Sequence, residues 1–311
     1  MSRAFVFPGQ GAQAIGMGKD LAEAYPAARA VFDEVDEALG EKLSDLIWNG
    51  DIETLTLTEN AQPALMAMSL AAIRALASEG VGVESAAFVA GHSLGEYSAL
   101  AAAEALSVTD TARLLRTRGK AMQQAVPVGE GAMAAVLGLD LAAVQAVAQE
   151  AAQGDVCAAA NDNDPAQVVV SGTKAAVERA VEIAKGKGAK RALLLPVSAP
   201  FHCSLMQPAA EVMAEALAQV DIKAPKVPVV ANVRAEAVHD PAEIRALLVE
   251  QVTHSVRWRE SIQWMAGHGV DEIWEIGAGK ALSGMVRRIE KSVAVRAIGA
   301  PKDVAEAAAA V

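Results

Sequence analysis

Short apolar runs alternate with longer helical patterns in the first part of the chain. The runs at residues 4–7 and 86–90 have the length and side chains of buried strands. Apolar residues recur at helical spacing in four longer stretches: residues 17–39 with a break near Pro26, residues 62–79, residues 96–106 and residues from about 110 to 124. Asn60 is expected to cap the second of these helices, with Pro63 near its first turn. Strands that alternate with helices in this way predict an α/β fold with a parallel sheet.

The pattern changes at Pro127. Shorter elements then follow in the order strand, helix, strand, strand, helix, strand, at residues 132–139, 141–152, 156–160, 167–171, 174–185 and 192–197. This is the order of a ferredoxin-like unit. At 311 residues the chain exceeds the size at which one core keeps growing, so a large and a smaller domain are expected. We place the small domain at residues 127–198 and the discontinuous large domain at residues 1–126 and 199–311.

Two further features complete the predicted architecture. A helix is expected at residues 205–220, and three more strands, with helices between them, at residues 227–231, 272–276 and 293–298. Within the small domain, residues 161–165 form a polar stretch, Asn-Asp-Asn-Asp-Pro, between the two middle strands. We interpret that stretch as a simple turn, unless it faces the chemistry of the large domain.

The most informative motif is Gly91-His92-Ser93-Leu94-Gly95, which lies between a predicted strand and a predicted helix. G-x-S-x-G in this context is the nucleophile-elbow pattern. Side chains at Gly91 and Gly95 would collide with the neighbouring strand and helix, and the turn lifts the serine hydroxyl clear of the sheet. The Leu94 amide would lie at a helix N-terminus, where it can stabilise an oxyanion. The alternative is a glycine-flanked turn with an ordinary serine.

A loop at residues 8–13 follows the first strand and is rich in backbone amides. It lacks the Lys-Ser/Thr ending of a P-loop, so we reject nucleotide binding there. A strand-end loop beside an elbow commonly supplies a second oxyanion donor. A plain turn is an equally good interpretation from these residues alone.

One cation in the predicted helix near residues 110–124 lies on the apolar face of that helix. Arg118 falls among apolar side chains, far from the other basic residues of that helix, which are Arg113, Arg116 and Lys120. A desolvated guanidinium is costly unless it meets an anion, and it cannot lose its proton. Arg118 therefore either forms a buried ion pair or snorkels, or it receives a substrate carboxylate. The pattern favours neither the structural role nor the substrate-binding role.

A nucleophilic serine needs a base, and the chain contains five histidines. His92 adjoins the serine, and adjacent side chains in such a turn diverge. His202 follows directly on a predicted strand end, where sites collect in α/β proteins. We therefore prefer His202 as the base over a purely structural role. No spacing of histidine, cysteine and carboxylate residues resembles a metal site.

Composition excludes several classes of function. The formal net charge is −11, which argues against binding to nucleic acid or to an anionic membrane. No apolar run is long enough to span a bilayer, and the N-terminal run is too short for a signal peptide. Two cysteines, Cys157 and Cys203, are then expected as reduced thiols in a cytoplasmic protein. We also expect a monomer.

These motifs together are more specific than the elbow alone. Over essentially its full length the chain resembles the bacterial malonyl-CoA:acyl carrier protein transacylases, the discrete acyltransferases of fatty-acid synthesis. The resemblance is carried by Phe7-Pro8-Gly9-Gln10-Gly11, Gln62-Pro63-Ala64, Gly91 to Ser98, Arg118-Gly119-Lys120, Asn161 to Pro165 with Gln167-Val168-Val169, Phe201-His202 and Gly277 to Gly279. It implies an α/β-hydrolase-like large domain with an inserted ferredoxin-like domain.

The resemblance also implies roles for particular residues. Ser93 would be the acylated nucleophile, His202 its base, and Arg118 the receptor for the malonyl carboxylate. The backbone amides of Gln10 and Leu94 would form the oxyanion hole. A main-chain carbonyl, at the position of Gln251, would orient the histidine in place of an aspartate. The remaining substrate-binding positions are Asn161, Asn163 and His92, with the two asparagines along the pantetheine path.

The implied reaction needs no bound cofactor. Malonyl-CoA is the substrate, and the phosphopantetheine thiol arrives on an acidic acyl carrier protein that binds transiently. Because this chain is acidic too, docking requires a local basic patch. Two sets of residues are candidates, although either could be a solvated helix end: Lys185, Lys187, Lys190 and Arg191, or Arg287, Arg288 and Lys291.

Three other functions compete with this one. An acyltransferase that serves a polyketide synthase would share the chemistry and differ in its carrier. An esterase or thioesterase would share the elbow, but Arg118 in an apolar stripe and the missing aspartate argue against it. A non-catalytic scaffold would not need Ser93, His202 and Arg118 together.

Overall fold

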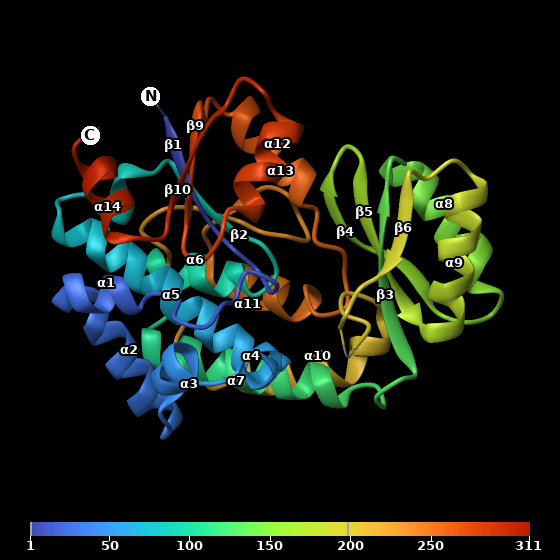
Figure 1. Cartoon of the computed structure of the whole chain (residues 1–311), viewed down its shortest axis with the longest axis horizontal. Helices are drawn as coiled ribbons and strands as arrows, with labels where there is room; N and C mark the ends of the chain where they lie inside the picture. The colour runs from blue at the N-terminus through green and yellow to red at the C-terminus, as the bar shows by residue number, and fades with distance from the viewer. Residues whose placement is uncertain (1, 198) are drawn as a thin grey trace.

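The computed structural model describes residues 2–197 and 199–311 and is built on two separate sheets (Figure 1). The larger sheet has six strands in the order β10-β9-β1-β2-β7-β8. All neighbours are parallel except β8, which pairs antiparallel with β7. The strands are β1 Arg3–Phe7, β2 Phe88–Gly91, β7 Val229–Val230, β8 Ala237–Val238, β9 Glu272–Ile276 and β10 Ala294–Ile298. The predicted α/β class is confirmed.

Helices cover both faces of this sheet because its strands are apolar on both sides. In β1, Phe5 and Phe7 point into the larger core, whereas Ala4 and Val6 point into a smaller core on the other face. The smaller core is closed by α12 and α13. The helices of this part are α1 Lys19–Ala24, α2 Pro26–Leu39, α3 Leu43–Asn49, α4 Ile52–Thr56, α5 Thr58–Ser78, α6 Gly95–Ala102, α7 Val108–Gln124, α10 Gln207–Ala218, α11 Pro241–Glu250, α12 Trp258–Gly267, α13 Ala281–Ile289 and α14 Pro301–Ala308.

The second sheet has four antiparallel strands in the order β4-β5-β3-β6. Its elements follow the predicted order: β3 Gly131–Leu137, α8 Leu141–Ala152, β4 Cys157–Asp164, β5 Gln167–Thr173, α9 Lys174–Gly186 and β6 Arg191–Leu194. Both helices pack on one face, and the unit lies to one side of the large sheet (Figure 1). We propose residues 127–198 as the inserted domain and residues 1–126 and 199–311 as the large one. The outer limits at residues 1 and 198 lie outside the described residues.

The predicted start of the long helix is wrong. Helix α5 begins at Thr58 after an N-cap at Leu57, so Pro63 lies inside the helix. The Asn60 side chain instead donates from Nδ2 to the carbonyl oxygen of Thr54, at 2.9 Å. Burial of this first turn in the core extends the helix past the expected cap, because packing outweighs a local capping preference.

Two other boundaries differ from the prediction. Helix α6 ends at Ala102, four residues early, and Glu104 just beyond it has a positive φ of 59°. Residues 161–164 are not a turn but the second half of β4, and all four are buried. Register shifts lie at both ends of this polar segment. The segment tolerates burial because its side chains find partners on both sides, as described below.

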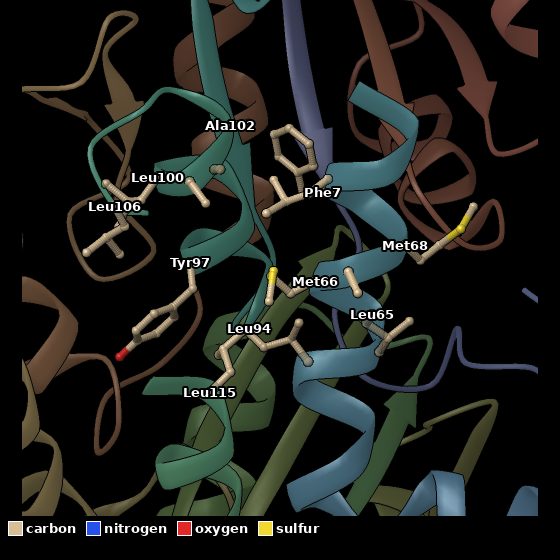
Figure 2. Packing of buried hydrophobic residues seen from close by; sticks show 14 of the residues in the cluster. Phe7, Leu65, Met66, Met68, Leu94, Tyr97, Leu100, Ala102, Leu106 and Leu115 are labelled. Carbon is tan, nitrogen blue, oxygen red and sulfur yellow. The ribbon is translucent and has the colours of Figure 1, made fainter. Parts of the chain in front are cut away.

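Apolar packing fixes the turn that carries the serine. The side chain of Leu94 is 1% exposed and belongs to the same core cluster as Leu65, Met66 and Leu115. Figure 2 shows these side chains gathered between α5, α6 and α7. Among the described residues, the structure has no helix that is both long and apolar enough to cross a membrane.

Candidate active site

The elbow has the tight geometry that its glycines predict. Strand β2 ends at Gly91 and α6 begins at Gly95. A Cβ atom on Gly91 would lie 1.9 Å from the carbonyl carbon of Gly95, and one on Gly95 would lie 2.3 Å from the carbonyl oxygen of Phe7. Ser93 itself has a φ of 54°, in the left-handed region. The turn therefore holds Ser93 in a strained backbone conformation that the surrounding structure must enforce.

Ser93 and His202 meet although 109 residues separate them in the chain. The Ser93 Oγ lies 2.8 Å from His202 Nε2, and His202 Nδ1 lies 2.9 Å from the carbonyl oxygen of Gln251. A carbonyl can only accept, so Nδ1 carries the proton and Nε2 offers its lone pair to the serine. Burial and the positive charge of Arg118 lower the pKa of His202 to about 3. The imidazole is thus neutral and ready to accept a proton.

Arg118 reaches the serine from α7. Its side chain is 1% exposed, and its Nη2 lies 3.2 Å from Ser93 Oγ. Nη1 donates to Gln62 Oε1 at 2.8 Å and Nη2 donates to Gln251 Oε1 at 2.9 Å. Among the described residues no carboxylate forms a salt bridge with Arg118, so the buried ion pair considered for it is not formed. A buried cation held only by neutral acceptors, beside the candidate nucleophile, is arranged to receive an anion.

A cavity of about 520 Å³ opens over the serine. It lies between the elbow, the loop at residues 8–13 and strands β4 and β5 of the small sheet. Eight of the predicted site residues line it: Gln10, His92, Ser93, Leu94, Arg118, Asn161, Asn163 and His202. Gln251 is fully buried behind His202 and Arg118.

Two backbone amides are free at the wall of this cavity. Leu94 is the N-cap residue of α6, and Gln10 lies in the loop that follows β1. Within the described residues neither amide donates a hydrogen bond to the protein. Free N–H groups at a helix start and in an adjoining loop form the kind of site that holds an oxyanion.

In the polar half of β4, alternate side chains point to opposite sides of the strand. On the cavity side, Asn163 Oδ1 lies 2.8 Å from His92 Nε2, and the His92 ring packs edge-on against Trp258. On the other side, Asp162 pairs with Arg259 of α12 at 2.8 Å and Asp164 with Arg288 of α13 at 2.7 Å. Alternation along the strand therefore gives the cavity its asparagines and gives the large domain its ion pairs.

Asp162 should stabilise the fold more than a surface acid does. We expect Asp162→Ala to lower the free energy of unfolding by about 2–3 kcal/mol, because it leaves the guanidinium of Arg259 without its buried partner. Asp155→Ala is the matched control, since the Asp155 side chain is 44% exposed in its pair with Arg179, whereas that of Asp162 is 1% exposed, and loss of Asp155 should cost at most about 1 kcal/mol. Urea denaturation of both variants measures the difference. Equal losses would mean that the Asp162 pair contributes no more than a surface pair.

Sequence reasoning missed three residues that support the site, Gln62, Asn232 and Glu96, and it missed the role of the Gln251 side chain. Gln62 and the side chain of Gln251 hold the guanidinium. Asn232 accepts from the Ser93 amide at 2.8 Å and donates to the Gly91 carbonyl at 2.7 Å. Glu96 accepts from the backbone amide of Asn232 and from Gln251. Asn232 could have been found as a polar residue at a parallel strand end, and Glu96 as an acid in an apolar helix.

A strained serine, a neutral histidine bound to it and free amides at the cavity wall are the groups that a serine-nucleophile acyl-transfer site on an α/β fold requires. The model of the family described as acyl transferase domain matches residues 4–298. The malonyl CoA-acyl carrier protein transacylase of Bacillus subtilis strain 168 is 49% identical over 97% of this chain and 94% of its own. The chain therefore belongs to the acyl transferase domain family, among the malonyl CoA-acyl carrier protein transacylases.

Solved structures agree with this assignment. The acyl-carrier-protein-S-malonyltransferase from Bartonella henselae superposes with a TM-score of 0.98 at 56% identity, covering 100% of this chain and 99% of its own. A malonyl-transacylase in complex with a type II polyketide synthase acyl-carrier protein superposes with a TM-score of 0.97 at 41% identity, covering 100% of both chains. The predicted fold class is confirmed by these likenesses.

Proposed function

We propose that this protein transfers a malonyl group from malonyl-CoA to the phosphopantetheine thiol of an acyl carrier protein, in fatty-acid synthesis. The observation that carries the proposal is the buried guanidinium of Arg118, which has no carboxylate partner among the described residues and lies 3.2 Å from the serine hydroxyl. A carboxylate on the acyl group would supply the missing anion within reach of the reacting carbonyl.

The proposed acylation step uses the contacts described above. Ser93 Oγ attacks the thioester carbonyl while His202 Nε2 takes the hydroxyl proton, and the amides of Gln10 and Leu94 hold the oxyanion. Collapse of the tetrahedral intermediate breaks the carbon–sulfur bond. His202 returns the proton to the leaving sulfur, so CoA departs as a neutral thiol and malonyl-Ser93 remains.

Transfer reverses these steps with another thiol. The phosphopantetheine thiol gives its proton to His202 and attacks the malonyl-serine carbonyl. The carbon–oxygen bond to Ser93 breaks, and the proton returns to Oγ. The Gln251 carbonyl keeps Nδ1–H directed away from the serine in both halves of the cycle. We assign Asn161, Asn163 and His92 to the pantetheine arm, because they line the same cavity.

The test of this proposal is the intact mass of the protein after brief mixing with malonyl-CoA. We expect a malonyl adduct that disappears when holo acyl carrier protein is added, with malonyl appearing on the carrier. Acetyl-CoA is the control and should label weakly. An unmodified protein that releases CoA would instead indicate a hydrolase, and one that releases none would indicate a scaffold.

A polyketide carrier is the second candidate acceptor. It is favoured by the likeness to a malonyl-transacylase bound to a type II polyketide synthase carrier protein. Transfer to either carrier would use the same chemistry in the same enzyme fold. The rates of transfer to the two carriers therefore distinguish the two functions. We expect faster transfer to the fatty-acid carrier than to a polyketide carrier at equal concentration. The reverse order would assign the protein to polyketide synthesis.

We propose that the carrier docks on the basic end of α13. This helix contributes Ala281, Leu282 and Met285 to the cavity wall, and its Arg287 is exposed and forms no salt bridge within the described part of the chain. In the rival patch, Lys185 and Lys187 are already paired with Glu182 and Glu150. The other two cations of that patch, Lys190 and Arg191, are exposed and likewise form no salt bridge among the described residues. We therefore prefer α13 because this helix also lines the cavity, where the carrier must deliver its thiol.

Charge reversal tests this docking site. We expect Arg287→Glu to raise the KM for the carrier by roughly tenfold, because a rim attraction becomes a repulsion, with little change in the KM for malonyl-CoA. Lys187→Glu is the matched control and should change neither value. Steady-state kinetics at low salt would measure both. A larger effect of Lys187→Glu would move the docking site to the small sheet.

A further inference from the structure

Glu96 is a buried acid without a cationic partner. It occupies the first turn of α6, three residues after the serine, and is 3% exposed. No salt bridge to Glu96 forms among the described residues, although an isolated buried carboxylate is costly. Burial raises the pKa of Glu96 to about 7. The proposed reaction assigns Glu96 no step, so its burial needs another explanation.

One hydrogen-bond partner of Glu96, Gln251, also contacts the serine, the histidine and the arginine of the site. Gln251 Nε2 donates to Glu96 Oε2 at 2.7 Å and to the Ser93 carbonyl at 3.0 Å. Gln251 Oε1 accepts from Arg118 Nη2 at 2.9 Å, and the Gln251 main-chain carbonyl accepts from His202. The side chain of Gln251 therefore connects the acid to the guanidinium.

The two ends of the Gln251 amide are similar in shape and opposite in hydrogen bonding. A guanidinium can only donate, so it requires the amide oxygen. The acceptor at Glu96 requires the amide nitrogen. With Glu96 in place only one orientation satisfies both neighbours, and that orientation presents the oxygen to Arg118.

We propose that Glu96 is a positioning residue that holds the Gln251 amide in this orientation and thereby keeps Arg118 directed at the acyl group. The inference rests on the proposed function, since it concerns selection of a malonyl over an acetyl group. Without an acceptor at position 96 the Gln251 Nε2 keeps only its longer hydrogen bonds, to the Ser93 carbonyl at 3.0 Å and to Asn232 Oδ1 at 3.4 Å, so the orientation of the amide is held less firmly. The amide oxygen then fixes Arg118 less firmly, and selection for a carboxylate weakens.

A purely structural role for Glu96 makes a different prediction. Its second hydrogen bond, from the Asn232 backbone amide at 3.1 Å, supports the elbow, because Asn232 holds the Ser93 amide. Damage to the elbow misplaces the nucleophile and slows acylation by malonyl-CoA and by acetyl-CoA to the same extent. The ratio of malonyl to acetyl acylation therefore separates the two roles, whereas the absolute rate does not.

The experiment compares Glu96→Leu with Glu96→Gln. Leucine removes the acceptor, whereas glutamine can keep an oxygen in its place. Single-turnover acylation of the whole protein by malonyl-CoA and acetyl-CoA gives the ratio. We expect Glu96→Leu to lower the malonyl-to-acetyl ratio by about tenfold or more, the effect of a lost hydrogen bond to a charged group, and Glu96→Gln to restore most of it. An unchanged ratio in Glu96→Leu overturns the proposal.

Gln251→Leu supplies the second measurement, because it removes the connecting side chain and leaves the main-chain carbonyl for His202. We expect the same decrease in the malonyl-to-acetyl ratio. The double variant should show no further decrease, since both changes break the same connection from Glu96 through Gln251 to Arg118. If Glu96→Leu does not fold, an unchanged ratio in Gln251→Leu overturns the proposal. A parent protein that forms no malonyl adduct refutes the proposed function instead, and that outcome is distinct from an unchanged ratio.

Discussion

Ser93→Ala is expected to abolish the malonyl-enzyme adduct and to lower transfer to the carrier by roughly 10⁴-fold or more, the scale seen when a catalytic nucleophile is removed. The hydroxyl is the atom that lies 2.8 Å from His202 Nε2, and alanine offers nothing in its place. The remaining groups still bind substrate and hold an oxyanion, so a small residual activity is expected.

Ser98→Ala is the matched control for this change. Ser98 lies in α6, five residues after Ser93, is fully buried, and its hydroxyl has no hydrogen-bond partner in the part of the chain that the structure describes. Its loss should leave acylation unchanged and should not destabilise the helix. Intact mass after mixing with malonyl-CoA measures the malonyl adduct on both variants. A full-size adduct on Ser93→Ala would place the acyl group on a different residue.

Arg118→Ala is expected to lower malonyl acylation by roughly 150- to 5,000-fold, which corresponds to about 3–5 kcal/mol, the cost of removing one partner of a buried charge pair. The substrate carboxylate would enter a cavity with no cation to meet it. The amide oxygens of Gln62 and Gln251 would also lose their donor. Acylation by acetyl-CoA needs no such cation, and its rate should fall far less. The preference for malonyl over acetyl therefore becomes smaller.

Arg118→Lys is the informative companion variant. Lysine keeps the charge but cannot reproduce the planar fork that serves both glutamines and the acyl group. We expect an intermediate loss, with malonyl still preferred over acetyl. Rates of acylation by malonyl-CoA and acetyl-CoA measure the preference. Equal losses for the two substrates in Arg118→Ala would show that Arg118 supports the fold and does not select the acyl group.

Local patterns were sufficient to predict the fold class, which is confirmed, and to single out Ser93 as the candidate nucleophile. Strands such as β1 are apolar on both faces, and the elbow glycines are required by sterics that act within a few residues. The order of short elements after Pro127 likewise predicted the four-stranded sheet. Boundaries were less certain, because α5 and β4 extend where tertiary burial outweighs capping and turn preferences.

The conformation of the Asn161–Asp164 segment depends on contacts that no local pattern contains. As an isolated stretch it has the composition of a turn. In the folded chain, Arg259 and Arg288 neutralise its two aspartates, and His92 pairs with Asn163. Those partners come from residues about 70 to 124 positions away, so they exist only after the two sheets pack together.

The motifs in the sequence determine which chemical groups the site contains, because strand–turn–helix sterics act locally and Arg118 interrupts an apolar helix face. Their arrangement comes from long-range packing. The sequence pattern left open whether Arg118 pairs with a carboxylate, and the structure surrounds it with the amide oxygens of Gln62 and Gln251. Glu96 and Asn232 meet across 136 residues to hold the elbow. Hydrogen bonds over such separations have no local periodicity, so they follow only from the folded chain.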